Sequence, residues 1–129
     1  MLSNLAAVRS TYEGSSVENG ARLGALLDPD VEWIEAAGFP YGGTYRGPDA
    51  VRAGVFARLG SEWDQYRAVA DAFYDAGDTI VVTGTYHGTY VATGRGMQAS
   101  FAHVWTVRVG KIVRFEQYVD SAKVREAMS

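Results

Sequence analysis

Hydrophobic residues in the first part of the chain recur at the spacing of an α-helix. Over residues 4–18 the recurring positions are Leu5, Val8 and Tyr12, and over residues 19–27 they are Leu23, Leu26 and Leu27. The second helix should end at Asp28, because the residue before a proline avoids the helical conformation. The pattern therefore predicts two helices, followed by a short strand over residues 31–36.

A segment rich in glycine and aromatic residues, residues 38–50, precedes a third predicted helix. Pro48 suits the first turn of that helix, which runs to about Gly60 with a stripe of Val51, Val55, Phe56 and Leu59. Beyond it, β-branched and aromatic residues dominate, and Gly77 and Gly110 mark tight turns. We predict hairpins over residues 63–91 and 97–120, and a short final helix from Ser121.

The order of the elements, helices first and strands after, predicts an α+β fold with a curved antiparallel sheet. With 129 residues and 47% hydrophobic content, the chain should form one domain, residues 1–129. Its net charge of −3, without a basic stripe, argues against nucleic acid or an anionic membrane as partner. Zero cysteines exclude disulfides and thiolate chemistry. Because neither a membrane span nor a signal peptide is recognisable, we expect a cytoplasmic location.

The last hairpin carries several residues capable of chemistry, and its register decides which of them share a face. With Val109 and Gly110 as the turn, Arg108 lies opposite Lys111. Counting outward in a regular antiparallel ladder pairs His103 with Glu116, Val104 with Phe115 and Ala102 with Gln117. In this register, both faces of the hairpin are partly apolar. We therefore expect one face to be covered by helices and the other by a second subunit.

Four segments resemble, in the same order, those of the nuclear transport factor 2-like superfamily, in its SnoaL-like or ketosteroid-isomerase-related branch. They are LLDPDVEW, YRGPDAVRAGVF, DAGDTIVVTGTYHGTY and FAHVWTVRVGKIVRFEQYVD. The resemblance covers essentially the whole chain. It implies a curved sheet wrapped around the N-terminal helices to form a cone with a mostly apolar internal pocket, and often a homodimer. The resemblance implies a pocket but no particular reaction, since the family includes isomerases, cyclases, a dehydratase and non-catalytic domains.

The ketosteroid isomerases imply particular site residues. Tyr12 falls near their tyrosine donor in the first helix, and their carboxylate base falls on Ile34 or Glu35, depending on a one-residue gap. Their protonated acid falls on Ala102, which cannot donate a hydrogen bond. Since one of two oxyanion donors is missing, steroid isomerisation by that mechanism is not expected.

The acid–base candidates lie mainly on the last two strands. His103 beside Glu116 could be a general base near neutral pH, with the carboxylate fixing its tautomer. The alternative is a structural histidine in the core or in a subunit interface. Asp120 stands where some SnoaL-like cyclases keep their acid, although Gln117 and Tyr118 compete for that alignment. Asp120 also suits the cap of the final helix.

Aromatic and apolar residues should line the pocket, although core packing explains them equally well. The candidates are Trp33, Tyr41, Phe56, Trp63, Tyr86, Val104 and Phe115. His87 is a further candidate, because the dehydratase that the chain resembles uses two histidines on strands. The chain has no HxH, HExxH or cysteine motif, so we predict no metal and no cofactor.

These residues lead to two hypotheses. The first is a homodimer that binds a small, largely apolar or aromatic metabolite and catalyses cofactor-free isomerisation, dehydration or cyclisation. His103 or Glu35 would be its base, and Tyr12, Gln117 or His87 would orient the substrate or stabilise an oxyanion. The second is a non-catalytic ligand-binding or dimerisation module, with His103 in the subunit seam.

Overall fold

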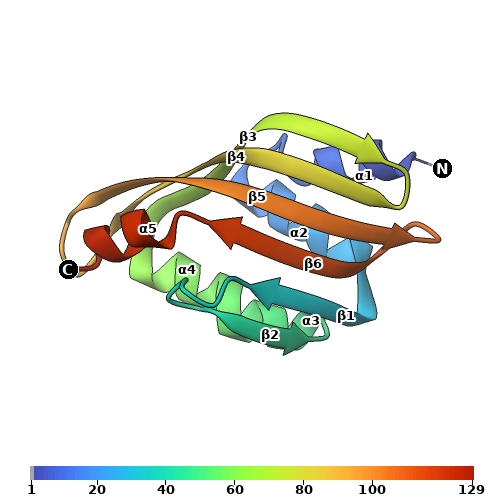
Figure 1. Cartoon of the computed structure of the whole chain (residues 1–129). Coiled ribbons are helices and arrows are strands. Elements are labelled where there is room, and N and C mark those ends of the chain that lie inside the picture. The colour runs from blue at the N-terminus through green and yellow to red at the C-terminus, as the bar shows by residue number, and fades with distance from the viewer. Residues whose placement is uncertain (1) are drawn as a thin grey trace.

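A strongly curved sheet of six strands is the main feature of the structure (Figure 1). The computed structural model describes residues 2–129, and the strand order is β2-β1-β6-β5-β4-β3. Neighbouring strands are antiparallel except β1 and β6, which run parallel, so the sheet is mixed rather than wholly antiparallel. The strands are β1 (Leu27–Glu35), β2 (Gly43–Arg46), β3 (Trp63–Ala76), β4 (Thr79–Tyr90), β5 (Gly96–Arg108) and β6 (Lys111–Val119).

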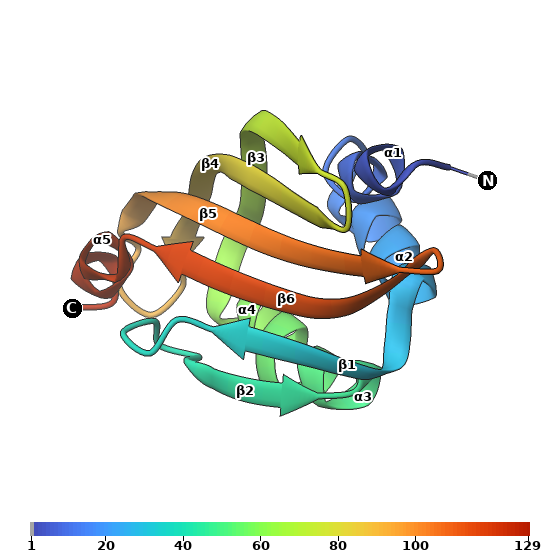
Figure 2. The same ribbon diagram turned by 45° about the vertical axis from the view of Figure 1, so that its right-hand side comes forward.

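Helices cover one side of this sheet and one of its ends. Figures 1 and 2 show the first two helices behind the long strands, the next two beside β1 and β2, and the last helix beyond the end of β6. Along the described residues, no helix is long and apolar enough to cross a membrane. The helices are α1 (Asn4–Ser10), α2 (Ser16–Leu26), α3 (Pro48–Val51), the π-helical turn η1 (Arg52–Phe56), α4 (Ala57–Glu62) and α5 (Ser121–Ala127).

Capping side chains mark where the first two helices begin. Ser15 and Glu18 form a capping box, in which each side chain bonds the other residue's backbone N–H. The predicted helix over residues 4–18 is therefore wrong in its extent. It ends at Ser10, and α2 begins at Ser16.

The predicted third helix is confirmed, but the hydrophobic spacing did not indicate its π-helical turn. Within that turn, Gly54 lies against the ring of Tyr45, and a Cβ there would stand 2.3 Å from the Tyr45 Cε1 atom. Tyr45 belongs to β2, a strand that was not predicted within the glycine-rich segment. The glycine thus allows the helix to pack closely on β2.

One extra residue in β6 changes which side chains of the last hairpin share a face. The pairs nearest the turn follow the predicted register, but the ladder then shifts so that Val113 has no partner. Val113 is thus a β-bulge, with two residues of one strand facing one of the other. His103 consequently lies opposite Gln117, and its predicted pairing with Glu116 is wrong.

The bulge exchanges the two faces of β6 beyond Val113. Phe115 and Gln117 are buried on the concave face, whereas Glu116 and Tyr118 lie on the convex face. The other two predicted pairs are also wrong, since Val104 lies opposite Glu116 and Ala102 opposite Tyr118.

The core lies between the concave face of the sheet and the helices, and aromatic side chains fill much of it. Burial of each large side chain contributes roughly 1.5–3 kcal/mol. Since few polar groups share this interior, each of them requires a partner. The buried aromatic residues are Trp33, Phe39, Tyr41, Trp63, Tyr86, Phe101, Trp105 and Phe115.

Gly84 lets β4 approach its neighbours closely, which makes it a test of this packing. A Cβ at Gly84 would lie 2.1 Å from the carbonyl oxygen of Val69 and 2.6 Å from the ring of Phe101. We expect Gly84→Ala to lower the free energy of unfolding by about 1–3 kcal/mol, measured by urea denaturation. Gly24→Ala in α2 is the matched control, because nothing lies within 4 Å of its Cβ. It should stabilise the protein by up to about 1 kcal/mol. Equal effects of both substitutions would contradict the close packing.

Candidate active site in the interior

Among the described residues, four polar or charged residues are buried: Thr11, Glu35, His103 and Gln117. Glu35 ends β1, Gln117 lies on β6 and His103 on β5, and these three strands are adjacent in the sheet. Their side chains face the concave side, which the helices cover. The structure therefore brings Glu35, at the end of β1, together with the two residues nominated from the last hairpin.

A chain of hydrogen bonds runs through the interior, with His103 at its centre. The Tyr12 hydroxyl lies 2.6 Å from His103 Nδ1, and the Tyr86 hydroxyl lies 2.5 Å from Nε2. Trp105 Nε1 donates to the Tyr12 oxygen at 2.9 Å, and Gln117 Nε2 donates to the Tyr86 oxygen at 2.9 Å. Both ring nitrogens of His103 are thus occupied.

His103 is held in its neutral form by this arrangement. A neutral imidazole has one N–H, so one nitrogen donates to a tyrosine and the other accepts from the second tyrosine. Burial lowers the pKa of His103 to about 3, because the interior disfavours the charged ring. The Ala36 N–H donates to Gln117 Oε1 at 3.1 Å, which turns the amide nitrogen of Gln117 toward Tyr86.

Glu116 takes no part in this chain, and its predicted contact with His103 is wrong. On the convex face it forms an ion pair with Arg114 at 3.4 Å and accepts a hydrogen bond from Tyr118 at 2.9 Å. Two tyrosines, rather than a carboxylate, fix the orientation of the imidazole.

Glu35 is the buried carboxyl group of the site. Trp33 and Glu35 are two residues apart in β1, so both point to the same face, and Trp33 Nε1 donates to Glu35 Oε1 at 2.9 Å. In the described part of the chain, Oε2 is buried without a hydrogen-bond partner. Burial raises the pKa of Glu35 to about 7, against the opposing effect of the Trp33 hydrogen bond. Such a carboxyl group can exchange a proton with a neighbouring group near neutral pH.

Tyr66 belongs to the same site and was missed by sequence reasoning. The β3–β4 register shifts beside Gln65, which has a φ of 53°, and the bulge turns Tyr66 inward against Tyr86, with ring centroids 5.3 Å apart. Burial, and the charge of Glu35 after it, raise the pKa of Tyr66 well above its ordinary value. Regular alternation from the buried Trp63 would place Tyr66 on the outer face, so the sequence held no signal for it.

Most of the predicted ligand-binding aromatics lie in the core around this site. Phe115 stacks on Trp33 with ring centroids 3.8 Å apart, and Phe56 meets Trp33 edge-on at 5.5 Å. Tyr41 and Trp63 form another buried pair, in which Trp63 Nε1 donates to the Tyr41 hydroxyl at 3.0 Å.

Three candidates lie outside the interior. Val104 and His87 are on the convex face, so neither lines the concave side. Asp120 precedes α5, where its carboxylate accepts a hydrogen bond from the backbone N–H of Lys123 at 3.4 Å. The predicted helix-capping role of Asp120 is thus confirmed.

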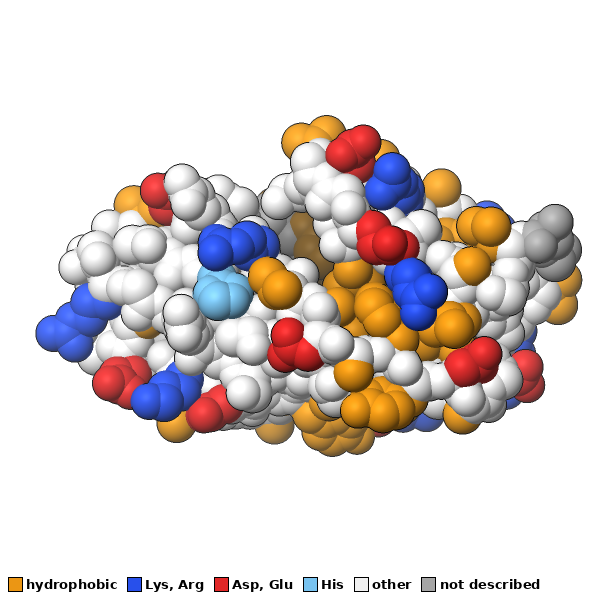
Figure 3. Space-filling model, turned by 90° about the horizontal axis from the view of Figure 1, so that it is seen from above, with side chains coloured by type: hydrophobic (Ala, Val, Ile, Leu, Met, Phe, Trp, Pro, Cys, Tyr) orange, Lys and Arg blue, Asp and Glu red, His pale blue; other side chains and the backbone are white. Residues whose placement is uncertain are grey.

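The inward side of β3 is incompletely covered. The inward residues Ala68 and Ala70 are small, and with Tyr66 they are only partly buried. Figure 3 views the molecule from above, onto the β3 side of Figure 1, and shows a hollow with hydrophobic side chains at its bottom.

Known proteins agree with this architecture. The SnoaL-like domain matches residues 8–115, so the chain belongs to the SnoaL-like family, and the predicted resemblance is confirmed. The chain is similar to an NTF2-like protein from Burkholderia thailandensis E264, with 45% identity over 100% of this chain and 99% of that chain and a TM-score of 0.94. Among curated proteins, none matches the chain.

Two further solved structures share the fold. TerC, co-crystallised with polyporic acid, is 28% identical over 97% of both chains, with a TM-score of 0.84. A putative SnoaL-like polyketide cyclase from Jannaschia sp. CCS1 is 16% identical over 98% of this chain and 91% of that chain, with a TM-score of 0.82. The predicted α+β, NTF2-like fold is therefore confirmed.

Glu35 should make the stability of the protein depend on pH. Because its pKa rises from 4.5 to about 7 on folding, the native protein retains a proton that the unfolded chain releases between these pH values. The contribution of Glu35 to the free energy of unfolding should therefore fall as pH rises through this window, by on the order of 3 kcal/mol. Below pH 6.5 the buried His103, whose pKa is lowered to about 3, contributes a slope of the opposite sign. Glu35→Gln should remove the Glu35 contribution alone, as measured by urea denaturation from pH 4 to 9.

The difference in the free energy of unfolding between wild type and Glu35→Gln isolates the Glu35 effect, because His103 contributes alike to both proteins. The exposed Glu13→Gln variant is the matched control and should keep the wild-type slope. Parallel pH profiles for wild type and Glu35→Gln would show that Glu35 is not a buried acid of raised pKa.

Proposed function

We propose that this SnoaL-like protein binds a small, largely apolar or aromatic metabolite in its interior, and that Glu35 transfers a proton without a cofactor. The observation that carries the proposal is the buried Glu35 oxygen, which has no hydrogen-bond partner among residues 2–129. Leaving such an atom unpaired costs roughly 1–3 kcal/mol, which a ligand group at this position would offset. A pKa of about 7 lets Glu35 act as base or acid near neutral pH.

The surroundings of Glu35 favour a flat, mostly apolar ligand. Trp33 lies beside the carboxyl group with Phe115 stacked on it, and Tyr66 and Tyr86 share the same environment. Aromatic walls with a few polar groups are typical of small-molecule sites. TerC, which has this fold and was co-crystallised with polyporic acid, supports binding of a small organic molecule.

Tyr86 and Tyr66 are the proposed donors to the negative charge that proton removal leaves on the ligand. When His103 carries its proton on Nε2, Tyr86 accepts hydrogen bonds from His103 and Gln117, and its own proton is free for a ligand oxygen. Tyr12 then donates to His103 Nδ1. His103 would thus position Tyr86 rather than act as the base, and donors fixed in advance are effective at stabilising an oxyanion.

Proton transfer can be measured before the natural substrate is known. In D₂O, a site base replaces the C–H protons beside the carbonyl of a bound ketone with deuterium, which NMR detects. We expect exchange in a panel of aromatic ketones, at a rate that rises with pH to a plateau above the Glu35 pKa of about 7. Glu35→Gln should slow exchange by about 10²–10⁴-fold, and Tyr66→Phe by a smaller factor.

Ligand binding is measured alongside exchange, by quenching of tryptophan fluorescence with polyporic acid and with each ketone. Glu35→Gln should still bind, and Glu13→Gln should match wild type in both assays. Binding without exchange for every ketone would contradict proton transfer and favour a non-catalytic ligand-binding protein.

The convex face of the sheet is the proposed dimer interface. If this face were open to water, its middle would be unusually apolar for a sheet. Tyr118 is 55% exposed there. His103 faces the interior, so it would not belong to this seam. The central residues, adjacent across β4, β5 and β6, are Val81, Thr83, Ala102, Val104 and Tyr118.

Sedimentation velocity tests this interface. Wild type should sediment as a dimer, and Val104→Arg as a monomer, because the substitution would place a charge in the middle of the seam. Val109→Arg is the control, since Val109 is 95% exposed in the β5–β6 turn, and it should remain dimeric. A monomeric wild type, or a dimeric Val104→Arg, would contradict the proposal.

A further inference from the structure

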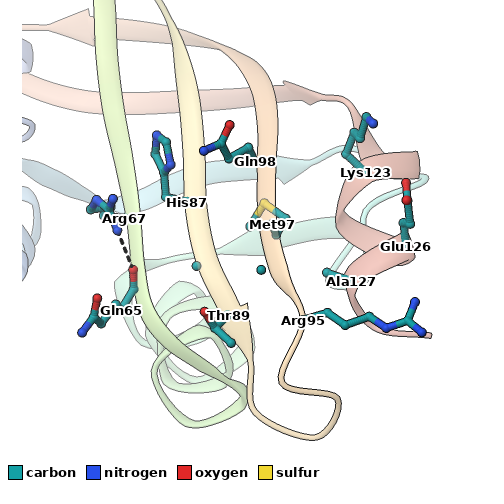
Figure 4. Close-up of a pocket in the computed structure, with 12 residues that line it drawn as sticks. Gln65, Arg67, His87, Thr89, Arg95, Met97, Gln98, Lys123, Glu126 and Ala127 are labelled. Atoms are coloured by element: carbon teal, nitrogen blue, oxygen red, sulfur yellow. Dashed lines mark hydrogen bonds between the residues drawn. The ribbon is translucent and has the colours of Figure 1, made fainter.

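A second concavity lies on the outer side of the molecule, between β3 and α5. It has a volume of about 590 Å³, which is within the range of small-molecule sites, and Glu35 does not line it. Figure 4 shows His87 and Gln98 side by side on β4 and β5, while Lys123 and Glu126 project from α5. We call this concavity the outer groove.

The outer groove collects cationic side chains that have no carboxylate partner. Arg67, Arg95 and Lys123 line it, and none of them forms an ion pair within residues 2–129. Glu126 is the one acidic side chain among the lining residues. In contrast, each of five other arginines pairs with a carboxylate: Arg22, Arg46, Arg52, Arg58 and Arg114. A groove of excess positive charge attracts anions, even in a protein whose net charge is −3.

The cationic groups stand apart around the outer groove rather than meeting at one point. In Figure 4, Arg67 lies on the β3 side and Lys123 on the α5 side, with His87 and Gln98 between them. Arg95 lies beside α5 and extends away from the middle of the groove. Two separated cations, with hydrogen-bonding side chains between them, suit a ligand with an acidic group at each end.

We propose that the outer groove binds an elongated organic dianion, with one acidic group near Arg67 and the other near Lys123. Gln98 and His87 would contact the middle of the ligand. Glu126 would oppose binding, because its carboxylate repels an anion. This site is independent of the proposed chemistry at Glu35.

The test is an NMR titration of the labelled protein at low ionic strength with adipate, a six-carbon dicarboxylate, and with hexanoate, its monoanionic counterpart. Adipate should give saturable shifts of the groove residues, and hexanoate should bind more weakly. Arg67→Gln and Lys123→Gln should each raise the Kd of adipate about 2- to 5-fold. Glu126→Gln should lower that Kd.

Arg108→Gln is the matched control, because Arg108 also lacks an ion-pair partner in the described chain but does not line the groove. It should leave the Kd of adipate unchanged, as should Glu35→Gln. Any of three results would overturn the proposal: no saturable shifts with adipate, equal binding of hexanoate, or an Arg108→Gln effect equal to that of Arg67→Gln. A loss of adipate binding in Glu35→Gln alone would show that the anion binds at the interior site instead.

Discussion

The bulge at Val113 determines which side chains β6 contributes to the interior. In a regular ladder from the β5–β6 turn, Arg114 and Glu116 would face the helices, and each buried charge would cost several kcal/mol. The extra residue instead buries Phe115 and Gln117 and leaves the charged residues outside. On the convex face, Arg114 then lies 3.3 Å from Glu32 of the neighbouring strand β1. One inserted residue thus separates an ionic outer face from an aromatic interior.

The hydrogen-bond chain depends on this separation. Gln117 joins the backbone of Ala36, just after β1, to Tyr86 on β4, and Tyr86 in turn orients His103. A second bulge, beside Gln65 in β3, turns Tyr66 to the same place. A left-handed φ at a residue other than glycine costs on the order of 1 kcal/mol or more. Two irregularities therefore deliver two polar side chains to one site, and β-bulges commonly re-aim side chains in this way.

The sequence predicted the regular parts of the molecule and missed the irregular ones. Gly77 and Gly110 located both hairpin turns, and alternation correctly placed His103 with Phe101 and Trp105 on one face of β5. The partners on β6 could not be predicted, because Val113 is an ordinary strand residue that carries no signal for a bulge. Tyr66 was missed for the same reason, since Gln65 carries no signal for a left-handed conformation.

Most residues of the candidate site were predicted, but their chemistry was not. Tyr12, Glu35, His103 and Gln117 were all nominated, yet the hydrogen-bond partners of His103 depend on the register and could not be known. The structure holds His103 neutral between two tyrosines and leaves Glu35 as the titratable group. Burial favours the neutral form of both residues, so it lowers the pKa of the basic His103 and raises the pKa of the acidic Glu35.

The central claim is that this interior holds Glu35 protonated until near neutral pH. A ¹³C NMR titration that follows the side-chain carboxyl carbon of Glu35, assigned with the Glu35→Gln variant, tests it most directly. A midpoint near pH 7, well above the ordinary value of 4.5, is the predicted result. A midpoint near 4.5 would show that water or a polar partner reaches the carboxylate, and would contradict the account of the site.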